Sequence, residues 1–86
     1  MSKPLTIELI TIKAKTSQIE RIKKLNVWGN DIDDVALIAK MPLLEVVSLS
    51  VNKIRYLKPF NNLQNLKELY LRQNLISSKF KGKQLA

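Results

Sequence analysis

The stretches LEVVSLSVNKI (residues 44–54) and LKELYLRQNLI (residues 66–76) decide the fold of this chain, because they repeat one pattern of apolar and polar positions. A third copy, IKKLNVWGNDI, occupies residues 22–32. Each copy starts 22 residues after the one before it, and all three carry an asparagine at the same place. A fixed interval of this size is typical of chains built from stacked repeats.

The pattern L-x-x-L-x-L-x-x-N-x-I is that of a leucine-rich repeat, in which a short strand is followed by a return segment. It predicts an α/β fold: a right-handed leucine-rich-repeat solenoid with a short parallel sheet on the concave side and helical or 3-10 returns on the convex side. We expect one domain, with an amino-terminal cap over residues 1–21 and repeats over 22–43, 44–65 and 66–78. Residues 79–86 form a basic tail with no evident carboxy-terminal cap.

The amino-terminal segment contains a predicted strand and a predicted helical turn. Apolar residues alternate imperfectly with polar ones over residues 5–12, which favours a short strand. Thr16 or Ser17 is suited to cap a helical turn that runs to Lys24 and directs Ile19 inward. Such a cap would cover the first apolar face of the solenoid.

The two return segments differ in composition. In the first, DIDDVALIAKMP (31–42), Asp33 is the predicted N-cap of a helix and Pro42 ends it. In the second, RYLKPFNNLQN (55–65), Pro59 disfavours a regular helix, so we expect a single short helical or 3-10 turn.

Each repeat has an asparagine where the predicted strand ends: Asn30, Asn52 and Asn74. A side-chain amide both donates and accepts hydrogen bonds, so it can pair backbone groups that would otherwise be buried without partners. The interval therefore predicts a structural ladder of three asparagines at one corner of the fold.

The strand residues between the buried apolar positions are predicted to point to the concave side. The interval of 22 residues arranges them in three rows: Lys24, Val46 and Glu68; Asn26, Ser48 and Tyr70; Trp28, Ser50 and Arg72. Tryptophan, tyrosine and arginine are the residue types most often found as binding hot spots. We predict that these nine residues bind a partner. An alternative is that Trp28 packs over the amino-terminal segment as a hydrophobic cover.

The composition argues against catalysis and against bound cofactors or metals. The 86 residues include no cysteine and no histidine, so the commonest metal ligand and the commonest general base are missing. Asp31, Asp33 and Asp34 form an acidic cluster without the glycine and the distal glutamate of a calcium loop. We therefore predict that the protein is not an enzyme and needs no cofactor.

The location follows from what the sequence does not contain. It has no apolar run long enough to span a membrane, and its first residues do not have the pattern of a secretory signal. Together with the lack of cysteine, this predicts an intracellular location and no membrane partner.

The apolar pattern stops after Ile76, because Lys79 takes an apolar position and Phe80 comes one position late. The last repeat should therefore expose an apolar flank. Three explanations stay open: the chain is a fragment, the tail folds back through Phe80 and Leu85, or another chain covers the flank, which would include self-association.

Three short segments resemble the amino-terminal domain of the cilia- and flagella-associated protein 410 family: KLNVWG (24–29), MP (41–42) and LSVN (49–52). The resemblance extends over residues 8–76, and the period is similar to that of the phosphatase-regulator type of leucine-rich repeat. It implies a non-enzymatic cytoplasmic protein of cilia, flagella or basal bodies that acts through protein–protein contacts. Family members continue with a further repeat, a cap and an oligomerising helix, so roles of those parts are not carried over.

The net charge of +8, from 15 Lys and Arg against 7 Asp and Glu, supports a second hypothesis. A nucleic-acid-associated scaffold, resembling the leucine-rich-repeat proteins of the spliceosome, would use such a basic surface. Lysines of the tail, at 79, 81 and 83, would add to it. Solubility is the simplest explanation of the charge, because the lysines are scattered along the sequence, and a protein partner remains the leading hypothesis.

Overall fold

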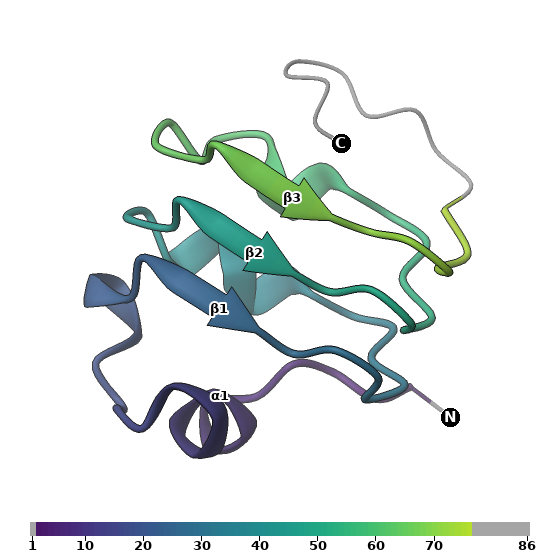
Figure 1. Ribbon diagram of the computed structural model, residues 1–86, viewed down its shortest axis with the longest axis horizontal. Coiled ribbons are helices and arrows are strands. Elements are labelled where there is room, and N and C mark those ends of the chain that lie inside the picture. Colours follow the sequence, from purple (N-terminus) through teal and green to yellow (C-terminus); the bar gives the residue numbers. More distant parts are fainter. Residues whose placement is uncertain (1, 77–86) are drawn as a thin grey trace.

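Three short parallel strands lie side by side in the order β1-β2-β3 (Figure 1). The computed structural model describes residues 2–76. Its strands are β1 (Lys24–Asn26), β2 (Val46–Ser48) and β3 (Glu68–Tyr70). Between them and before them lie one helix and three 3-10 segments: α1 (Ile7–Ala14), η1 (Ile19–Arg21), η2 (Ala36–Lys40) and η3 (Lys58–Phe60).

The predicted basic tail over 79–86, with Phe80 and Leu85, lies outside the described residues, as do the last two residues of the third predicted repeat.

The strands pair in the register that the interval of 22 residues predicts. Leu25 lies opposite Val47, and Val47 lies opposite Leu69. Pairing continues beyond the strand ends, since the N–H of Val27 donates to the carbonyl oxygen of Ser48 at 2.9 Å. The equivalent bond one interval later is also 2.9 Å long. The predicted side-by-side pairing of the three segments is therefore confirmed.

Asparagine side chains bond the corners that follow the strands. Asn52 is 6% exposed, and its amide donates to the carbonyl oxygens of Val27 and Leu49, both at 2.9 Å. Its oxygen accepts from the N–H groups of Asn30 and Ile32 at 3.0 and 2.9 Å. One side chain thus satisfies backbone groups of two successive segments.

Asn74 repeats this arrangement one interval later. Its amide donates to the carbonyl oxygen of Leu49 at 2.8 Å, and its oxygen accepts from the N–H of Ile54 at 2.9 Å. Asn30 is half-buried, and its amide donates to the carbonyl oxygen of Trp28 at 2.8 Å within its own corner. The predicted ladder is confirmed for the second and third asparagines.

A left-handed backbone residue directly precedes each of these asparagines. Gly29, Val51 and Gln73 have φ values of 66°, 60° and 57°. Glycine adopts this conformation freely, whereas a β-branched valine is strained in it. The same turn is therefore made by three different residue types, and the hydrogen bonds of the corner hold it in place.

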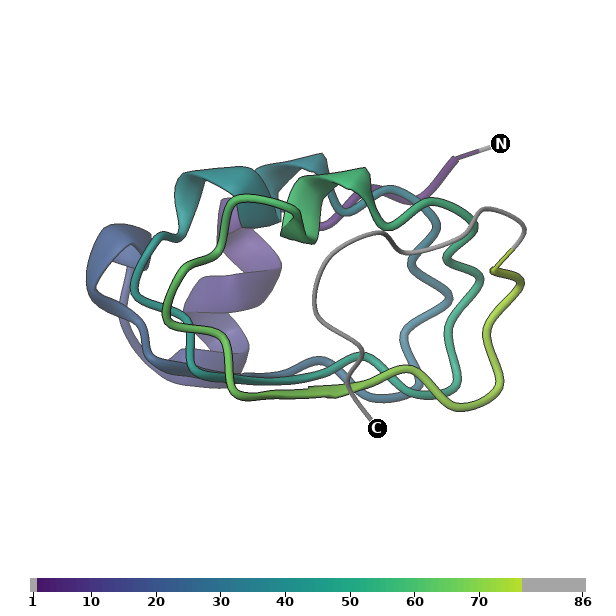
Figure 2. The same ribbon diagram turned by 90° about the horizontal axis from the view of Figure 1, so that it is seen from above.

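The returns lie on the side opposite the strands, where η2 and η3 contact each other (Figure 2). The single short turn predicted around Pro59 is confirmed as η3. The helix predicted from Asp33 is wrong in its type and its cap, because η2 is a 3-10 segment with Val35 at the N-cap position. The carboxylate of Asp33 instead accepts from the N–H of Lys3 at 2.8 Å, which holds the amino-terminal segment on the returns.

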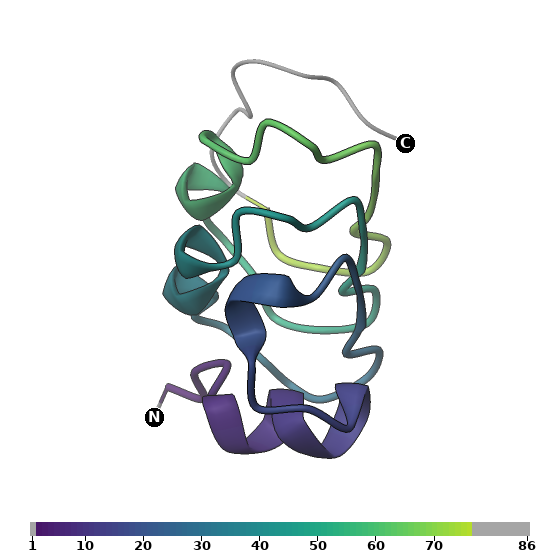
Figure 3. The same cartoon turned by 90° about the vertical axis from the view of Figure 1, so that its left-hand side faces the viewer.

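The strand predicted over residues 5–12 is wrong, since α1 occupies this part of the chain and lies beyond β1 (Figures 1 and 3). The hydroxyl of Thr6 accepts from the N–H of Leu9 at 3.1 Å and caps the helix. At the other end Lys15 is left-handed, and its N–H donates to the carbonyl oxygen of Thr11. An imperfect alternation of apolar residues is compatible with a strand or a short helix, and here the cap favours the helix.

The helical turn predicted after this segment is present but shorter. It is the 3-10 segment η1, which begins at Ile19, with Gln18 at the N-cap position. Neither Thr16 nor Ser17 is its cap, and the Thr16 hydroxyl accepts from the N–H of Gln18 at 3.1 Å. Lys24 lies in β1 rather than in the turn. Ile19 is buried, as predicted.

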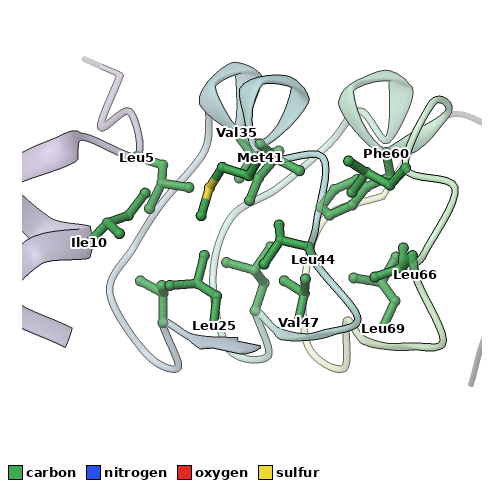
Figure 4. Close-up of a cluster of buried hydrophobic side chains, with 14 of the residues drawn as sticks. Leu5, Ile10, Leu25, Val35, Met41, Leu44, Val47, Phe60, Leu66 and Leu69 are labelled. Carbon is green, nitrogen blue, oxygen red and sulfur yellow. The ribbon is translucent and has the colours of Figure 1, made fainter. Parts of the chain in front are cut away.

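The core fills the space between the strands, the returns and α1 (Figure 4). Its fully buried side chains come from every layer and include Ile10, Met41, Val47 and Phe60. The strand side chains that point inward are anchored in this core, so the side chains that point outward have a rigid base.

Candidate partner-binding face

The nine residues predicted to bind a partner lie on one side of the sheet, which we call the sheet face. The strand register aligns the first two rows: Lys24, Val46 and Glu68; Asn26, Ser48 and Tyr70. The third row, made of Trp28, Ser50 and Arg72, follows the strand ends. All nine side chains are exposed or half-buried, whereas the residues between them are buried, except for the half-buried Leu71.

Backbone hydrogen bonds keep the third row in line beyond the strands. The N–H of Gly29 donates to the carbonyl oxygen of Ser50 at 3.0 Å. One interval later, the N–H of Val51 donates to the carbonyl oxygen of Arg72 at 2.8 Å. The three rows are therefore positioned by main-chain pairing.

A hollow of about 510 Å³ lies at the third row. Its lining residues are Trp28, Ser48, Ser50, Val51, Tyr70, Arg72 and Gln73. Five of these belong to the nine predicted residues, and small serines lie between the aromatic side chains and the arginine, as the sequence predicts. The other four predicted residues, Lys24, Asn26, Val46 and Glu68, do not line it.

Trp28 is 60% exposed, so the alternative in which it packs over the amino-terminal segment is wrong. The backbone N–H of Trp28 donates to the side-chain oxygen of Asn26 at 3.1 Å. An exposed indole beside a hollow offers a large apolar surface to a ligand.

Tyr70 is tied to Glu68, which lies two residues earlier on the same face of β3. The phenol hydroxyl donates a hydrogen bond to the Glu68 carboxylate. This hydrogen bond, then the negative charge of Glu68 and then partial desolvation raise the pKa of Tyr70 above its ordinary value. The bond fixes the orientation of the ring at the edge of the hollow.

Arg72 lies at the same hollow with a side chain open to solvent. The ion pairs formed between residues 2–76 lie elsewhere, between Lys53 and Asp31 at 3.9 Å and between Lys67 and Glu45 at 3.5 Å. The guanidinium is therefore available to a carboxylate or to a carbonyl oxygen of a ligand.

Val51 and Gln73 line the hollow although the sequence analysis did not select them. Both are the left-handed residues that precede an asparagine corner. The sequence offered one indication of these two residues. Gly29 is their equivalent in the first repeat, and a glycine at this place indicates a left-handed turn.

No group of three or more His, Cys, Asp or Glu that could hold a metal ion occurs among residues 2–76. No helix in the same part is long and apolar enough to cross a membrane.

Comparison with known proteins finds relatives over most of the chain, although no protein-family model matches it. Over 74 residues, which is 86% of the chain, it is 50% identical to an uncharacterised protein of Caenorhabditis elegans. It is 45% identical to cilia- and flagella-associated protein 410 of Homo sapiens and 42% identical to that of Mus musculus. The chain spans 16% of the nematode protein, 29% of the human protein and 30% of the mouse protein. The resemblance to cilia- and flagella-associated protein 410 is thus confirmed as homology over most of this chain.

Proposed function

We propose that this chain is a leucine-rich-repeat solenoid that binds another protein through its sheet face and catalyses no reaction. The observation that carries the proposal is the hollow at the third row, where Trp28 and Arg72 flank two serines. Tryptophan and arginine dominate the energetics of protein interfaces, and a site between them accepts a side chain of a partner.

The rigidity of the sheet supports this function. The sheet face stands on core residues such as Val47 and Leu69, which are 0% and 2% exposed. A partner that binds here would immobilise few additional groups of this chain, so less conformational entropy would oppose association. The three rows cross parallel strands and their side chains are exposed or half-buried, which suits an extended peptide segment.

We further propose that the protein acts in a cilium, flagellum or basal body. This part of the proposal is supported by the homology to proteins named for cilia and flagella. The chain spans less than a third of those proteins, so their other parts are outside the proposal.

A nucleic-acid-associated scaffold is the second candidate, and its support is the net charge of +8. An RNA titration at increasing salt separates the two candidates. RNA affinity that falls steeply with salt, without recovery of any protein partner, would favour the second.

The test of the sheet face is affinity purification from ciliated cells with a double variant, Trp28→Ala with Arg72→Glu. A matched control changes an aromatic residue and an arginine away from this face, Tyr56→Ala with Arg55→Glu, since Tyr56 is 62% exposed. Partners are cross-linked to the chain before purification. We expect the first variant to lose a partner that the control retains. Equal recovery by both variants, with circular dichroism showing that both are folded, would refute the proposal.

A further inference from the structure

Among residues 2–76, the excess of positive charge is concentrated in one short stretch. Residues 13–24 contain a single carboxylate, that of Glu20, and five cationic side chains: Lys13, Lys15, Arg21, Lys23 and Lys24. The rest of the described chain is nearly balanced, with seven cationic and six acidic side chains. Within residues 2–76 the lysines and arginines are therefore less evenly distributed than the sequence analysis assumed, because most of the excess charge of these residues lies in this segment.

The fold gathers this segment at one end of the sheet. Helix α1 contacts β1 and crosses from the side of the returns to the side of the strands, where Lys13 and Lys15 end it (Figure 2). The chain then passes through η1 and enters β1 at Lys24 (Figures 1 and 3). We call the surface formed by residues 13–24 the basic flank.

The charges of the basic flank are exposed and are not neutralised within the described chain. All five cationic residues are exposed, and neither of the two ion pairs between residues 2–76 involves them. The carboxy-terminal end of a helix favours cations, which accounts for Lys13 and Lys15. It does not account for Arg21, Lys23 and Lys24, which lie outside α1.

We propose that the basic flank is a second docking surface, which binds an acidic, unfolded polypeptide segment rich in glutamate or aspartate. Charge complementarity argues for an anionic ligand. The side-chain types argue for a polypeptide, because residues 13–24 contain no aromatic side chain on which nucleic-acid bases could stack and only one arginine. Flexible lysines suit carboxylates carried on a mobile chain, since a lysine ammonium acts as a point charge without a required plane.

The basic flank and the hollow of the sheet face lie at opposite ends of the strands. Lys24 is at the start of β1, whereas Trp28 and Arg72 follow the strand ends. Lys24 belongs to both surfaces but does not line the hollow, and the flank variant below leaves it unchanged. Variants of the flank can therefore be tested separately from variants of the hollow.

The experiment measures the affinity of a fluorescent oligoglutamate peptide for the whole chain at low and at physiological salt. The flank variant reverses four charges: Lys13→Glu, Lys15→Glu, Arg21→Glu and Lys23→Glu. The matched control reverses four others and has the same net charge: Lys3→Glu, Lys40→Glu, Lys53→Glu and Lys58→Glu. We expect the dissociation constant to rise on the order of tenfold or more for the flank variant and by a much smaller factor for the control.

A second variant with glutamine at the same four flank positions guards against misfolding, and it should weaken binding by a smaller factor than the glutamate variant. The double variant Trp28→Ala with Arg72→Glu should bind oligoglutamate within a factor of about two of the unchanged chain. Equal losses in flank and control variants would overturn the proposal, because bulk charge would then explain binding. Tighter binding of an RNA oligonucleotide than of oligoglutamate, with the same dependence on the flank, would overturn it in favour of a nucleic acid.

Discussion

The side-chain amide of Asn52 donates a 2.9 Å hydrogen bond to the carbonyl oxygen of Val27, a residue in the preceding strand segment. The oxygen of the same amide accepts from the N–H groups of Asn30 and Ile32. One nearly buried side chain thus joins the first two segments at the corner where their strands end. Stacking of the segments depends on this corner as well as on the apolar core.

Replacement of Asn52 by alanine should therefore be strongly destabilising. It would remove the hydrogen bonds that Asn52 makes to the N–H of Ile32 and to the carbonyl oxygen of Val27 in a buried corner. The carbonyl oxygen of Leu49 would keep its bond from Asn74. We expect the free energy of unfolding to fall by about 3 kcal/mol or more. Asn30→Ala is the control, with an expected loss of about 1 kcal/mol or less, because the Asn30 amide makes one bond in a half-buried place. Urea denaturation measures both, and equal losses would contradict the account of the ladder.

Gly29→Ala tests the left-handed turn before the first corner. Gly29 has φ +66°, and a Cβ atom added there would meet nothing within 4 Å, so the cost comes from the backbone alone. We expect a loss of about 1 kcal/mol in the free energy of unfolding. Gly29→Asn should cost less, because asparagine tolerates the left-handed conformation better than alanine. Denaturant titration in which asparagine costs as much as alanine would show that the conformation is not the cause.

Glu68→Gln should lower the pKa of Tyr70. In the native protein the hydrogen bond and the charge of Glu68 favour the neutral phenol, which raises the pKa. Glutamine removes the charge, so tyrosinate should form at lower pH. The chain has two tyrosines, so both proteins carry Tyr56→Phe, and ultraviolet absorbance then follows Tyr70 alone.

The sign of the linked stability change follows from the raised pKa. The interaction of Tyr70 with Glu68 stabilises the fold below the ordinary pKa of tyrosine, and this contribution is lost as pH rises through the raised value. The variant with glutamine should show a smaller loss of stability in that alkaline range. A titration curve of Tyr70 that does not move on substitution would contradict the contact.

The strand pairing and the asparagine ladder could be predicted because both follow from a strict interval. Once Leu25, Val47 and Leu69 occupy equivalent positions, parallel pairing aligns their neighbours automatically. The sheet face could be predicted for the same reason. The exposure of Trp28 could not be predicted, since it depends on where the amino-terminal segment lies. The sequence pattern indicated a strand in that segment, whereas the structure has α1.

The partners of isolated polar residues were the least predictable features. Asp33 has the sequence context of a helix cap, but its carboxylate bonds to the N–H of Lys3, 30 positions earlier. No local pattern reports such a contact. Val51 was missed at the hollow because a valine gives no sign of a left-handed turn, whereas the glycine at position 29 does.

The last test concerns α1, which stands where the sequence predicted a strand. A strand would place Ile10 and Ile12 on the same side, whereas the helix buries one and exposes the other. In α1, Ile10 is 0% exposed and is the helix residue buried in the core, whereas Ile12 is 72% exposed. In an alternating strand the two would point the same way. We expect Ile10→Ala to lower the free energy of unfolding by about 2–4 kcal/mol, since it leaves a cavity beneath β1, and Ile12→Ala to change it by about 0.5 kcal/mol or less. Similar losses for the two variants in urea denaturation would favour the strand and would remove α1 as the element that closes this end of the core.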